Sequence, residues 1–410
     1  MTVKMPPVAE QLPVLTRGAT DLISGEELES KLTRALDSRR PLTVKVGFDP
    51  TAADIHLGHT VLMRKMRDFQ RMGHRIVYVI GDFTAAIGDP SGRSKARPPL
   101  SREEIARNAE TYTEQAFKIL DRDATETRFN SEWLEGLGAR GLIQLAGRYT
   151  VARMLERRDF RTRYEEGIPI SVHEFLYPLA QAYDSVALEA DVELGGADQL
   201  FNLNVGRDLM PHYGQAPQVV MTVPLLEGTD GTQKMSKSSG NYVGIAEPPE
   251  EIYGKVMSIS DELMYRWYAL LTEEGEEGAI RRRSSAEGGS SHPRDLKRAL
   301  ARQIVAELHG DADSDAAEAH FDTVFAKKDL PDEIETTVVR AAADSISLAD
   351  LLKESGLATS KGEARRLVRG GGVKVDGERA TDEAADLAVP REALLQVGKR
   401  RFLRVILERG

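Results

Sequence analysis

Residues 43–80 restrict the fold more than any other part of this sequence, because they read as strand, helix, strand. Residues 43–48 and 75–80 are short apolar runs, and residues 57–72 between them have helical spacing that stops before Gly73. The second run is almost wholly apolar, as in a parallel strand covered on both faces. Such a βαβ unit has a right-handed crossover, and ligands collect where its strands end. The segment therefore predicts a parallel-sheet α/β domain with a site at that edge.

The spacing of apolar residues predicts further elements along the chain. Helices are expected at 22–40, 101–121, 140–160 and 172–186, a strand at 219–223, and more helices over 249–330, broken at 281–291. In the last part of the chain, short helices are expected at 347–355 and 360–369, and β-segments at 373–375, 394–397 and 402–407. The Gly-rich, polar stretch 228–240 reads as a mobile loop.

Composition indicates a globular protein with more than one domain. A chain of 410 residues with 41% hydrophobic and 29% charged residues exceeds one ordinary core. Its apolar runs are too short to span a bilayer, and its N-terminus lacks the pattern of a secretory signal, so we expect no membrane partner. The absence of cysteine excludes disulfides and thiolate metal sites and fits a reducing compartment.

The expected organisation is a doubly wound, Rossmann-like α/β domain, a helical domain and a small α+β domain. We place them at residues 1–245, 246–330 and 347–410, with a linker at 331–346. The last segment holds 13 Lys and Arg against 10 Asp and Glu, in a chain whose net charge is −10. Any RNA contact is therefore expected to be local to this basic end.

Two histidines are the first candidate residues for phosphate chemistry. His56 and His59 stand three residues apart at the mouth of the helix after the first strand, so both rings share one face. The helix start offers free N–H groups and partial positive charge to a phosphate, and Gly58 leaves room for a nucleotide. An incidental helix cap or a zinc pair are the alternatives. Zinc is disfavoured because cysteine is absent and no third ligand is obvious.

Two lysines, far along the chain, complete the pattern. Lys234 and Lys237 lie in the predicted loop, with Ser238 and a further hydroxyl beside them. A lysine is a mobile point charge that suits a departing polyphosphate, and such transfer needs fixed positive groups where charge builds up. A solvated basic loop is the alternative. Together with the histidines, the lysines predict cleavage of ATP between its α- and β-phosphates.

These segments resemble the class I aminoacyl-tRNA synthetases, and among them the bacterial tyrosyl-tRNA synthetases, over nearly the whole chain. The likeness rests on separate strings at residues 47–59, 87–92, 177–184, 195–199 and 234–238. It implies a tyrosine–tRNA ligase that activates L-tyrosine with ATP to tyrosyl-adenylate plus pyrophosphate and transfers tyrosine to the 3′ end of tRNA(Tyr). It also implies Mg2+ with the ATP, a homodimer and a cytoplasmic location, and a helical domain on the anticodon side.

The resemblance also implies roles for individual residues. Those implied in catalysis, at the α-phosphate, the pyrophosphate or the reacting carboxylate, are His56, His59, Lys234, Lys237, Ser238 and Gln199. Those implied in ATP binding are Gly47, Asp49, Thr51, Gly58, Asp198, Met235 and Ser236. Those implied in tyrosine binding are Lys45, Asp89, Tyr177, Gln181 and Asp184. Those implied in tRNA binding are Arg93, Arg97, Arg365, Arg366, Arg369, Lys399, Arg400 and Arg401.

The tyrosine site combines a residue pattern with one departure from the family. Tyr177, Gln181 and Asp184 fall at i, i+4 and i+7, one stripe of a helix, and the resemblance assigns Asp184 to the phenolic hydroxyl. A surface position for Asp184 is the alternative. Better-known members carry a second tyrosine where this chain, like a bacterial subgroup, has Lys45. Either Asp184 and water read the phenol, or Lys45 pairs with Asp184.

The end of the chain carries a second resemblance. Residues 360–377 are similar to a small RNA-binding domain shared with a ribosomal protein, and Arg365, Arg366 and Arg369 fall along one polar side of the expected helix. An amphipathic helix that only aids solubility is the alternative. Three other functions remain open from sequence: a tryptophanyl-tRNA synthetase, a non-catalytic RNA-binding paralogue, and a nucleotidyl transferase acting on a small molecule.

Overall fold

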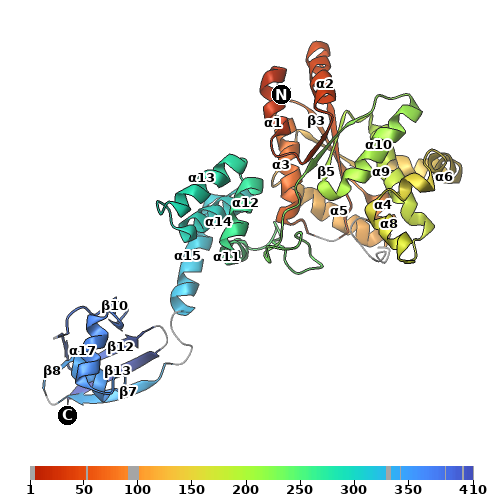
Figure 1. Ribbon diagram of the computed structural model, residues 1–410. Coiled ribbons are helices and arrows are strands. Elements are labelled where there is room, and N and C mark those ends of the chain that lie inside the picture. Colours follow the sequence, from red (N-terminus) through yellow and green to blue (C-terminus); the bar gives the residue numbers. More distant parts are fainter. Residues whose placement is uncertain are drawn as a thin grey trace. The chain divides into compact units, whose positions relative to one another are not determined.

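The computed structural model describes residues 5–51, 54–90, 101–328, 334–341, 343–383, 385–398 and 401–409. The chain forms two compact units, Met1–Glu318 and Ala319–Gly410 (Figure 1). Throughout the described residues, every helix is too short or too polar to cross a bilayer.

The first unit is built on a six-stranded sheet with the order β1-β6-β5-β2-β3-β4. Its strands are β1 (Asp21–Ile23), β2 (Thr43–Phe48), β3 (Arg75–Ile80), β4 (Thr125–Phe129), β5 (Val192–Gly196) and β6 (Val219–Val223). Strands β2 to β6 are parallel, and β1 joins β6 antiparallel. The chain turns in opposite directions from β2 and from β5, so their carboxyl ends form the switch point where such sheets bind ligands.

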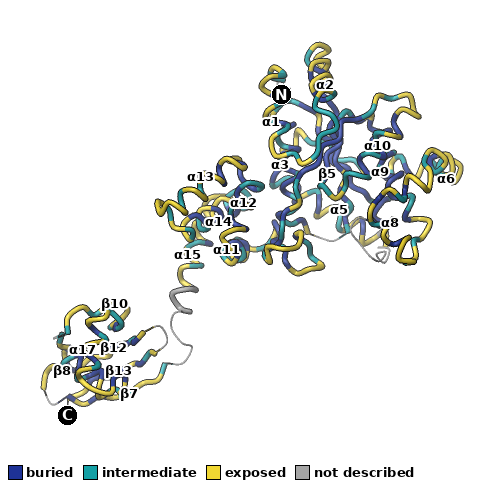
Figure 2. The backbone as a smooth tube through the Cα atoms, viewed as in Figure 1, coloured by how far each residue is buried: buried dark blue, intermediate teal, exposed yellow. Residues whose placement is uncertain are grey.

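Helices cover both faces of this sheet, which is the buried centre of the unit in Figure 2. They are α1 (Val8–Thr16), α2 (Gly25–Ser38), α3 (Leu57–Arg71), α4 (Asp82–Ile87), α5 (Arg102–Ala116), α6 (Ser131–Ala146), α7 (Val151–Met154), α8 (Arg158–Glu165), α9 (Leu176–Leu188) and α10 (Leu200–Leu209), with the 3₁₀ helices η1 (Val172–Phe175), η2 (Ala197–Gln199) and η3 (Met210–Tyr213). The helices α1 and α3 lie on one side of the sheet, and α9 and α10 on the other (Figure 1).

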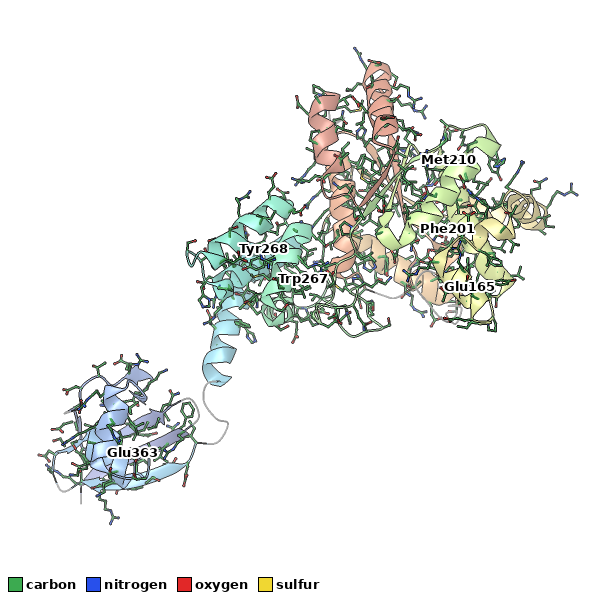
Figure 3. The ribbon with its side chains drawn as sticks, in the orientation of Figure 1. Glu165, Phe201, Met210, Trp267, Tyr268 and Glu363 are labelled. Carbon is green, nitrogen blue, oxygen red and sulfur yellow. The ribbon has the colours of Figure 1, made fainter. Side chains whose placement is uncertain are left out.

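A group of helices follows the sheet: α11 (Pro249–Ser258), α12 (Asp261–Leu271), α13 (Gly275–Glu287), α14 (Pro293–His309) and α15 (Asp311–Lys328). The first unit contains α11 to α14 and the part of α15 up to Glu318. The centre of this group of helices holds Trp267 and Tyr268, both fully buried (Figure 3). The Tyr268 hydroxyl donates to the carbonyl of Leu296 at 2.6 Å, and Trp267 Nε1 donates to the carbonyl of Glu227 at 3.1 Å. The second bond anchors the chain immediately before the loop that carries the two lysines.

The second unit has a five-stranded sheet, β10-β9-β12-β13-β7, and a two-stranded sheet, β11-β8. Its elements are β7 (Thr336–Ala341), β8 (Ser345–Ser347), α16 (Leu348–Glu354), α17 (Lys361–Arg369), β9 (Val373–Val375), β10 (Glu378–Arg379), β11 (Asp386–Ala388), β12 (Arg391–Val397) and β13 (Arg401–Arg409). Buried residues of both helices and of the main sheet form its core.

The sequence prediction of a doubly wound domain and a small α+β unit is confirmed, but several boundaries were wrong. Residues 22 and 23, expected to be helical, belong to β1, because Ser24 caps α2 by accepting from the Glu27 N–H. The expected break at 281–291 begins only after Glu287, since α13 continues through an Arg283–Glu287 ion pair. The expected helix 140–160 is divided among α6, α7 and α8.

Two strands and part of the second unit were also missed. β4 is a half-exposed edge strand without an apolar run, and β5 contains a buried glutamate and two glycines. The segment expected to be a linker, 331–346, contains β7, which pairs in parallel with β13. Parallel pairing to the far end of the chain leaves no local signal in the sequence.

Candidate active site

A cavity of about 720 Å³ opens at the carboxyl ends of β2 and β5. The predicted residues in its lining are Gly47, Asp49, Thr51, His56, Gly58, His59, Asp89, Tyr177, Gln181, Asp184, Asp198, Gln199, Lys234, Met235, Ser236 and Ser238. Of the residues predicted for catalysis, ATP and tyrosine, Lys45 and Lys237 lie outside the lining. A parallel sheet gathers these distant segments because its strand ends meet at one edge.

The histidine and lysine segments meet at the start of α3. The main chain of residues 55–57 pairs with that of residues 243–245 through N···O distances of 2.9 and 3.0 Å. A Cβ placed on Gly58 would lie 3.0 Å from the His56 ring and 3.5 Å from Met235 Cβ. The loop therefore lies against the first turn of α3, and both imidazoles and Lys234 line the same cavity.

Both imidazoles are neutral at physiological pH. Burial, followed by the charges of His59 and the two lysines, lowers the pKa of His56 to about 2. Burial and then Lys237 lower the pKa of His59 to about 4. His59 Nδ1 accepts from the backbone N–H of His56 at 3.2 Å, so the His59 proton resides on Nε2. His59 is thus a hydrogen-bond donor at the helix start.

The two lysines rest on carboxylates. Lys234 Nζ lies 2.8 Å from Asp198 Oδ2, and Lys237 Nζ lies 3.3 Å from Asp54 Oδ2. These pairs are partly exposed, so each is worth little on its own. A polyphosphate entering the cavity would therefore compete readily for both ammonium groups.

Hydrogen bonds from the Asn241 side chain stabilise the lysine loop, residues 228–240, which carries Lys234 and Lys237. Asn241 Oδ1 accepts from the Ser236 N–H at 2.9 Å, and its Nδ2 donates to Asp230 Oδ2 at 2.8 Å and to the carbonyl of Lys234 at 3.3 Å. A Cβ on Gly228 would lie 2.2 Å from Asn241 Cγ, so glycine is needed there. The loop has no helix or strand of its own among the described residues, and the Asn241 side chain adds to the few backbone hydrogen bonds that hold it.

Asp49 occupies the middle of the cavity. Tyr177 donates its hydroxyl to Asp49 Oδ2 at 2.9 Å, and Thr84 donates to Oδ1 at 2.7 Å. Burial, with a contribution from the charge of Asp89, raises the pKa of Asp49 to about 7 despite these bonds. The carboxyl group is therefore sensitive to a cationic ligand, which would favour its ionised form.

Asp89 and Gln199 are joined in a ring of polar contacts. Gln199 Nε2 donates to Asp89 Oδ2 at 3.0 Å, and Asn202 Nδ2 donates to Gln199 Oε1 at 2.9 Å. Arg157 closes the ring, with Nη1 at 3.0 Å from Asn202 Oδ1 and Nη2 at 3.6 Å from Asp89 Oδ1. The ring fixes which atoms of Asp89 and Gln199 face the cavity.

Asp184 is a buried carboxyl group at the far end of the cavity, not the surface residue of the alternative interpretation. Trp133 Nε1 donates to its Oδ1 at 2.8 Å, and Asn130 Nδ2 lies 3.4 Å from its Oδ2. Burial raises the pKa of Asp184 to about 6, while the charge of Lys45 opposes that rise. At neutral pH the group is an oriented hydrogen-bond acceptor.

Of the two alternatives for Lys45, a pair with Asp184 is wrong, because Lys45 pairs with Glu193 instead. Lys45 Nζ lies 2.6 Å from Glu193 Oε1, and neither side chain lines the cavity. The reason lies in the sheet, because Lys45 on β2 and Glu193 on β5 are register partners. Lys45 therefore does not contact a cavity ligand directly.

The polar residues of the site that were missed from sequence include Thr84, Asn130, Trp133, Arg157, Asn202 and Asn241. Asn130 follows β4 directly, at the carboxyl end of a parallel strand, so identifying β4 would have pointed to it. Trp133 and Asn241 act through long-range contacts that no local spacing reveals.

The second unit presents cations on α17 and β13. Arg365 and Arg366 are exposed, and Arg369 is exposed but paired with Glu383 through Nε–Oε1 at 2.6 Å. Arg401, at the start of β13, is also exposed. The other cations predicted to contact tRNA, Arg93, Arg97, Lys399 and Arg400, lie outside the described residues.

Comparison with known proteins identifies the family. The model described as tRNA synthetases class I (W and Y) matches residues 37–326. The chain belongs to this family of class I tRNA synthetases. A second model, described as S4 domain, matches residues 347–387.

The names of individual relatives of this class I synthetase are consistent with the family assignment. It is 54% identical to "Tyrosine--tRNA ligase" of Geobacter sulfurreducens over 97% of this chain and 99% of that protein. It is also 54% identical to "Tyrosine--tRNA ligase" of Burkholderia thailandensis, over 98% of this chain and 96% of that protein. Among solved structures, tyrosyl-tRNA synthetase of Archaeoglobus fulgidus, complexed with L-tyrosine, matches with a TM-score of 0.62 and 26% identity. That match covers 76% of this chain and 99% of the other.

Proposed function

We propose that this chain is a tyrosine–tRNA ligase, and the convergence of His56, His59 and Lys234 on one cavity, with the charge of Lys237 acting on both imidazoles, carries the proposal. The tyrosine carboxylate attacks the α-phosphate of ATP, pyrophosphate leaves, and tyrosine passes from the adenylate to the 3′-terminal ribose of tRNA. No protein nucleophile is required, because alignment and charge stabilisation lower the barrier. The names of the full-length relatives support this choice within the family.

Each half of the cavity suits one substrate. His59 Nε2–H and the α3 N-terminus donate toward the α-phosphate, while Lys234 and Lys237 leave their carboxylates to follow the pyrophosphate. Gly47 lines the cavity with open space where a Cβ would be, which leaves room for the nucleotide against β2. Asp198 is placed for the ribose once Lys234 moves to the phosphates.

The other half suits an amino acid with a phenol. Asp89, Tyr177 and Gln181 present oxygen atoms to the ammonium group, and Asp184 accepts from the phenolic hydroxyl. A site that pairs a substrate hydroxyl rejects the analogue lacking it, a rule for which tyrosyl-tRNA synthetases are themselves the usual example. Burial of Asp184 supports tyrosine over tryptophan as the substrate.

Magnesium fits the site only as a companion of ATP. Among the described residues, no three His, Asp or Glu side chains are grouped to hold a metal ion. Mg2+ is commonly bound through substrate phosphates and one or two carboxylates. Bound in this way, it would neutralise charge on the phosphates, with Asp54 and Asp198 as the nearby carboxylates that the lysines release.

The second unit supports the RNA half of the reaction. Exposed Arg365, Arg366 and Arg401 would contact phosphates of tRNA(Tyr), by backbone and shape rather than by base sequence. We place the reaction in the cytoplasm, where tRNA and ATP meet. We also propose a homodimer, supported by apolar side chains that are 74%, 62% and 80% exposed at Ile143, Val151 and Val172.

Exchange of radioactive pyrophosphate into ATP tests the proposal. Exchange should depend on tyrosine and be far weaker with phenylalanine or tryptophan. Exchange with tryptophan would establish the other specificity of the family. Absence of exchange with any amino acid would point to the RNA-binding paralogue, or to the nucleotidyl transferase if another substrate is turned over.

A further inference from the structure

A buried ion pair lies outside the cavity lining and contacts Gln181, which belongs to that lining. Lys45 and Glu193 are register partners on β2 and β5, and their side chains are 0% and 1% exposed. Desolvation makes a buried ion pair costly, and apolar residues of similar volume often replace one without loss of stability. Stability alone is therefore a weak explanation for this pair.

All three ammonium hydrogens of Lys45 have acceptors. Nζ lies 2.6 Å from Glu193 Oε1, 3.0 Å from the carbonyl of Gln181 and 3.2 Å from Ser185 Oγ. Glu193 in turn accepts from Ser185 Oγ at 3.1 Å and from Gln181 Nε2 at 3.2 Å, and also from Gln218 Nε2. Gln181 is thus held by its main chain and by its side chain.

This arrangement decides which end of the Gln181 amide meets a ligand. A carboxylate only accepts hydrogen bonds, so the NH2 group of Gln181 must turn toward Glu193. Gln181 lines the cavity, and its Oε1 is the atom left to face a ligand. The opposite orientation would present N–H donors to a cationic ligand. An oxygen acceptor is the partner that an ammonium group requires.

We propose that the Lys45–Glu193 pair is a positioning device for substrate recognition, which fixes Gln181 with its amide oxygen toward the ammonium group of tyrosine. The proposal rests on the proposed function. Lys45 has a second effect in the same direction, because its charge counteracts the burial that raises the pKa of Asp184. Glu193 acts on the pKa of Asp184 in the opposite direction and more weakly, so Lys45 is the member of the pair that acts on both ends of the amino-acid site.

A double-mutant cycle between Glu193 and Gln181 tests the proposal. In Glu193→Gln the new amide offers either a donor or an acceptor to Gln181, so the orientation of Gln181 is no longer enforced. We expect KM for tyrosine in pyrophosphate exchange to rise about tenfold, with KM for ATP unchanged. In a Gln181→Ala background, the same substitution should add nothing further, because its effect passes through Gln181.

A second variant tests the proposal in case Glu193→Gln does not fold. Lys45→Met combined with Glu193→Leu removes both charges together. We expect it to fold with reduced thermal stability, because Ser185 and Gln218 lose an acceptor, while KM for tyrosine still rises about tenfold or more. Glu174→Gln is the matched control, because it breaks the buried Arg163–Glu174 pair away from the cavity lining. The control should leave KM for tyrosine unchanged.

Two outcomes would overturn the proposal. One is a wild-type KM for tyrosine in the variant without the pair, and the other is an equal effect of Glu193→Gln with and without Gln181. Tyrosine-dependent exchange by the unmodified protein separates these outcomes from failure of the proposed function, because it is measured without any substitution.

Discussion

At the scale of single residues, the site works with groups whose protonation the cavity has adjusted. The two histidines are held neutral, with pKa values lowered to about 2 and about 4, mainly by burial. They therefore donate hydrogen bonds without adding charge, and the positive charge comes from the lysines. Burial raises the pKa of Asp184 to about 6, and its carboxylate still accepts hydrogen bonds at neutral pH.

Asp184 should control the choice between tyrosine and phenylalanine. Replacing it with alanine removes the acceptor for the phenol, so the ratio of kcat/KM for tyrosine to that for phenylalanine should fall about 10- to 100-fold. Pyrophosphate exchange with both amino acids measures this ratio. An unchanged ratio would mean that the phenol is read by another group.

The same ratio should depend on pH. Above about 6 the Asp184 carboxyl is ionised and accepts from the phenol, and below about 6 it is protonated and loses that capacity. The ratio should therefore fall as the pH is lowered through 6, while titration of Asp49 affects both substrates and cancels. Asp184→Asn should give a flat ratio, and a flat ratio in the unmodified protein from pH 7.5 to 5 would contradict the assignment.

Residue types and spacing were enough to find most of the predicted groups that line the cavity. The stripe formed by Tyr177, Gln181 and Asp184 could be read from helical spacing alone. The contacts that support these side chains could not be predicted from spacing. Trp133 and Asp184 are 51 residues apart in the sequence, and Lys45 and Glu193 are 148 residues apart. Which charges pair in a sheet depends on strand register, and β5 gave no clear signal.

At the scale of elements, the site depends on one close approach of the backbone, at Gly58, and on one open backbone position, at Gly47. The loop after β6 lies on the first turn of α3, where Gly58 admits Met235 and the His56 ring. The end of β2 passes the nucleotide side of the cavity at Gly47. Strands β2, β3 and β6 were predictable from apolar runs, whereas the return of residues 243–245 to α3 was not.

Gly47→Ala should weaken ATP binding without lowering the stability of the fold. The added methyl meets no atom within 4 Å, and the backbone there is in a region open to any residue, so the fold should be unharmed or stabilised by up to about 1 kcal/mol. The methyl would project into the nucleotide space and raise KM for ATP about tenfold. Thermal unfolding and exchange kinetics check both parts, and a drop in stability with normal ATP kinetics would contradict them.

Asn241→Ala should loosen the lysine loop without touching a substrate. The change removes the bonds that hold Ser236, Asp230 and Lys234, so kcat for exchange should fall about tenfold or more, with KM for tyrosine unaffected. A matched control is Thr232→Ala on the same loop, since Thr232 contacts only Asp230 through its side chain. Equal effects of the two changes would remove the special role of Asn241.

At the scale of the whole molecule, the catalytic cavity and the basic arginines belong to different compact units. The basic character of the end of the chain and its two short helices were predictable from composition and spacing. The start of the second unit was not predictable, because β7 enters the second sheet by parallel pairing with the last strand.

Removing residues 334–410 should therefore separate the two half-reactions. The truncation takes out the second sheet with β7 included and leaves every described residue of the cavity lining. Tyrosine-dependent exchange should stay within about twofold of the full chain, whereas charging of tRNA should fall by at least about 100-fold, since phosphate contacts supply much of RNA affinity. Normal charging by the truncated chain would exclude an RNA role for the second unit.

The convergence of two distant segments on one triphosphate is tested most directly by the single-turnover rate of tyrosyl-adenylate formation. His59→Ala and Lys234→Ala should each slow this step by about 100-fold or more, because each removes charge stabilisation from the transition state, while tyrosine affinity stays within about twofold. A wild-type rate of adenylate formation in either variant would contradict this central claim.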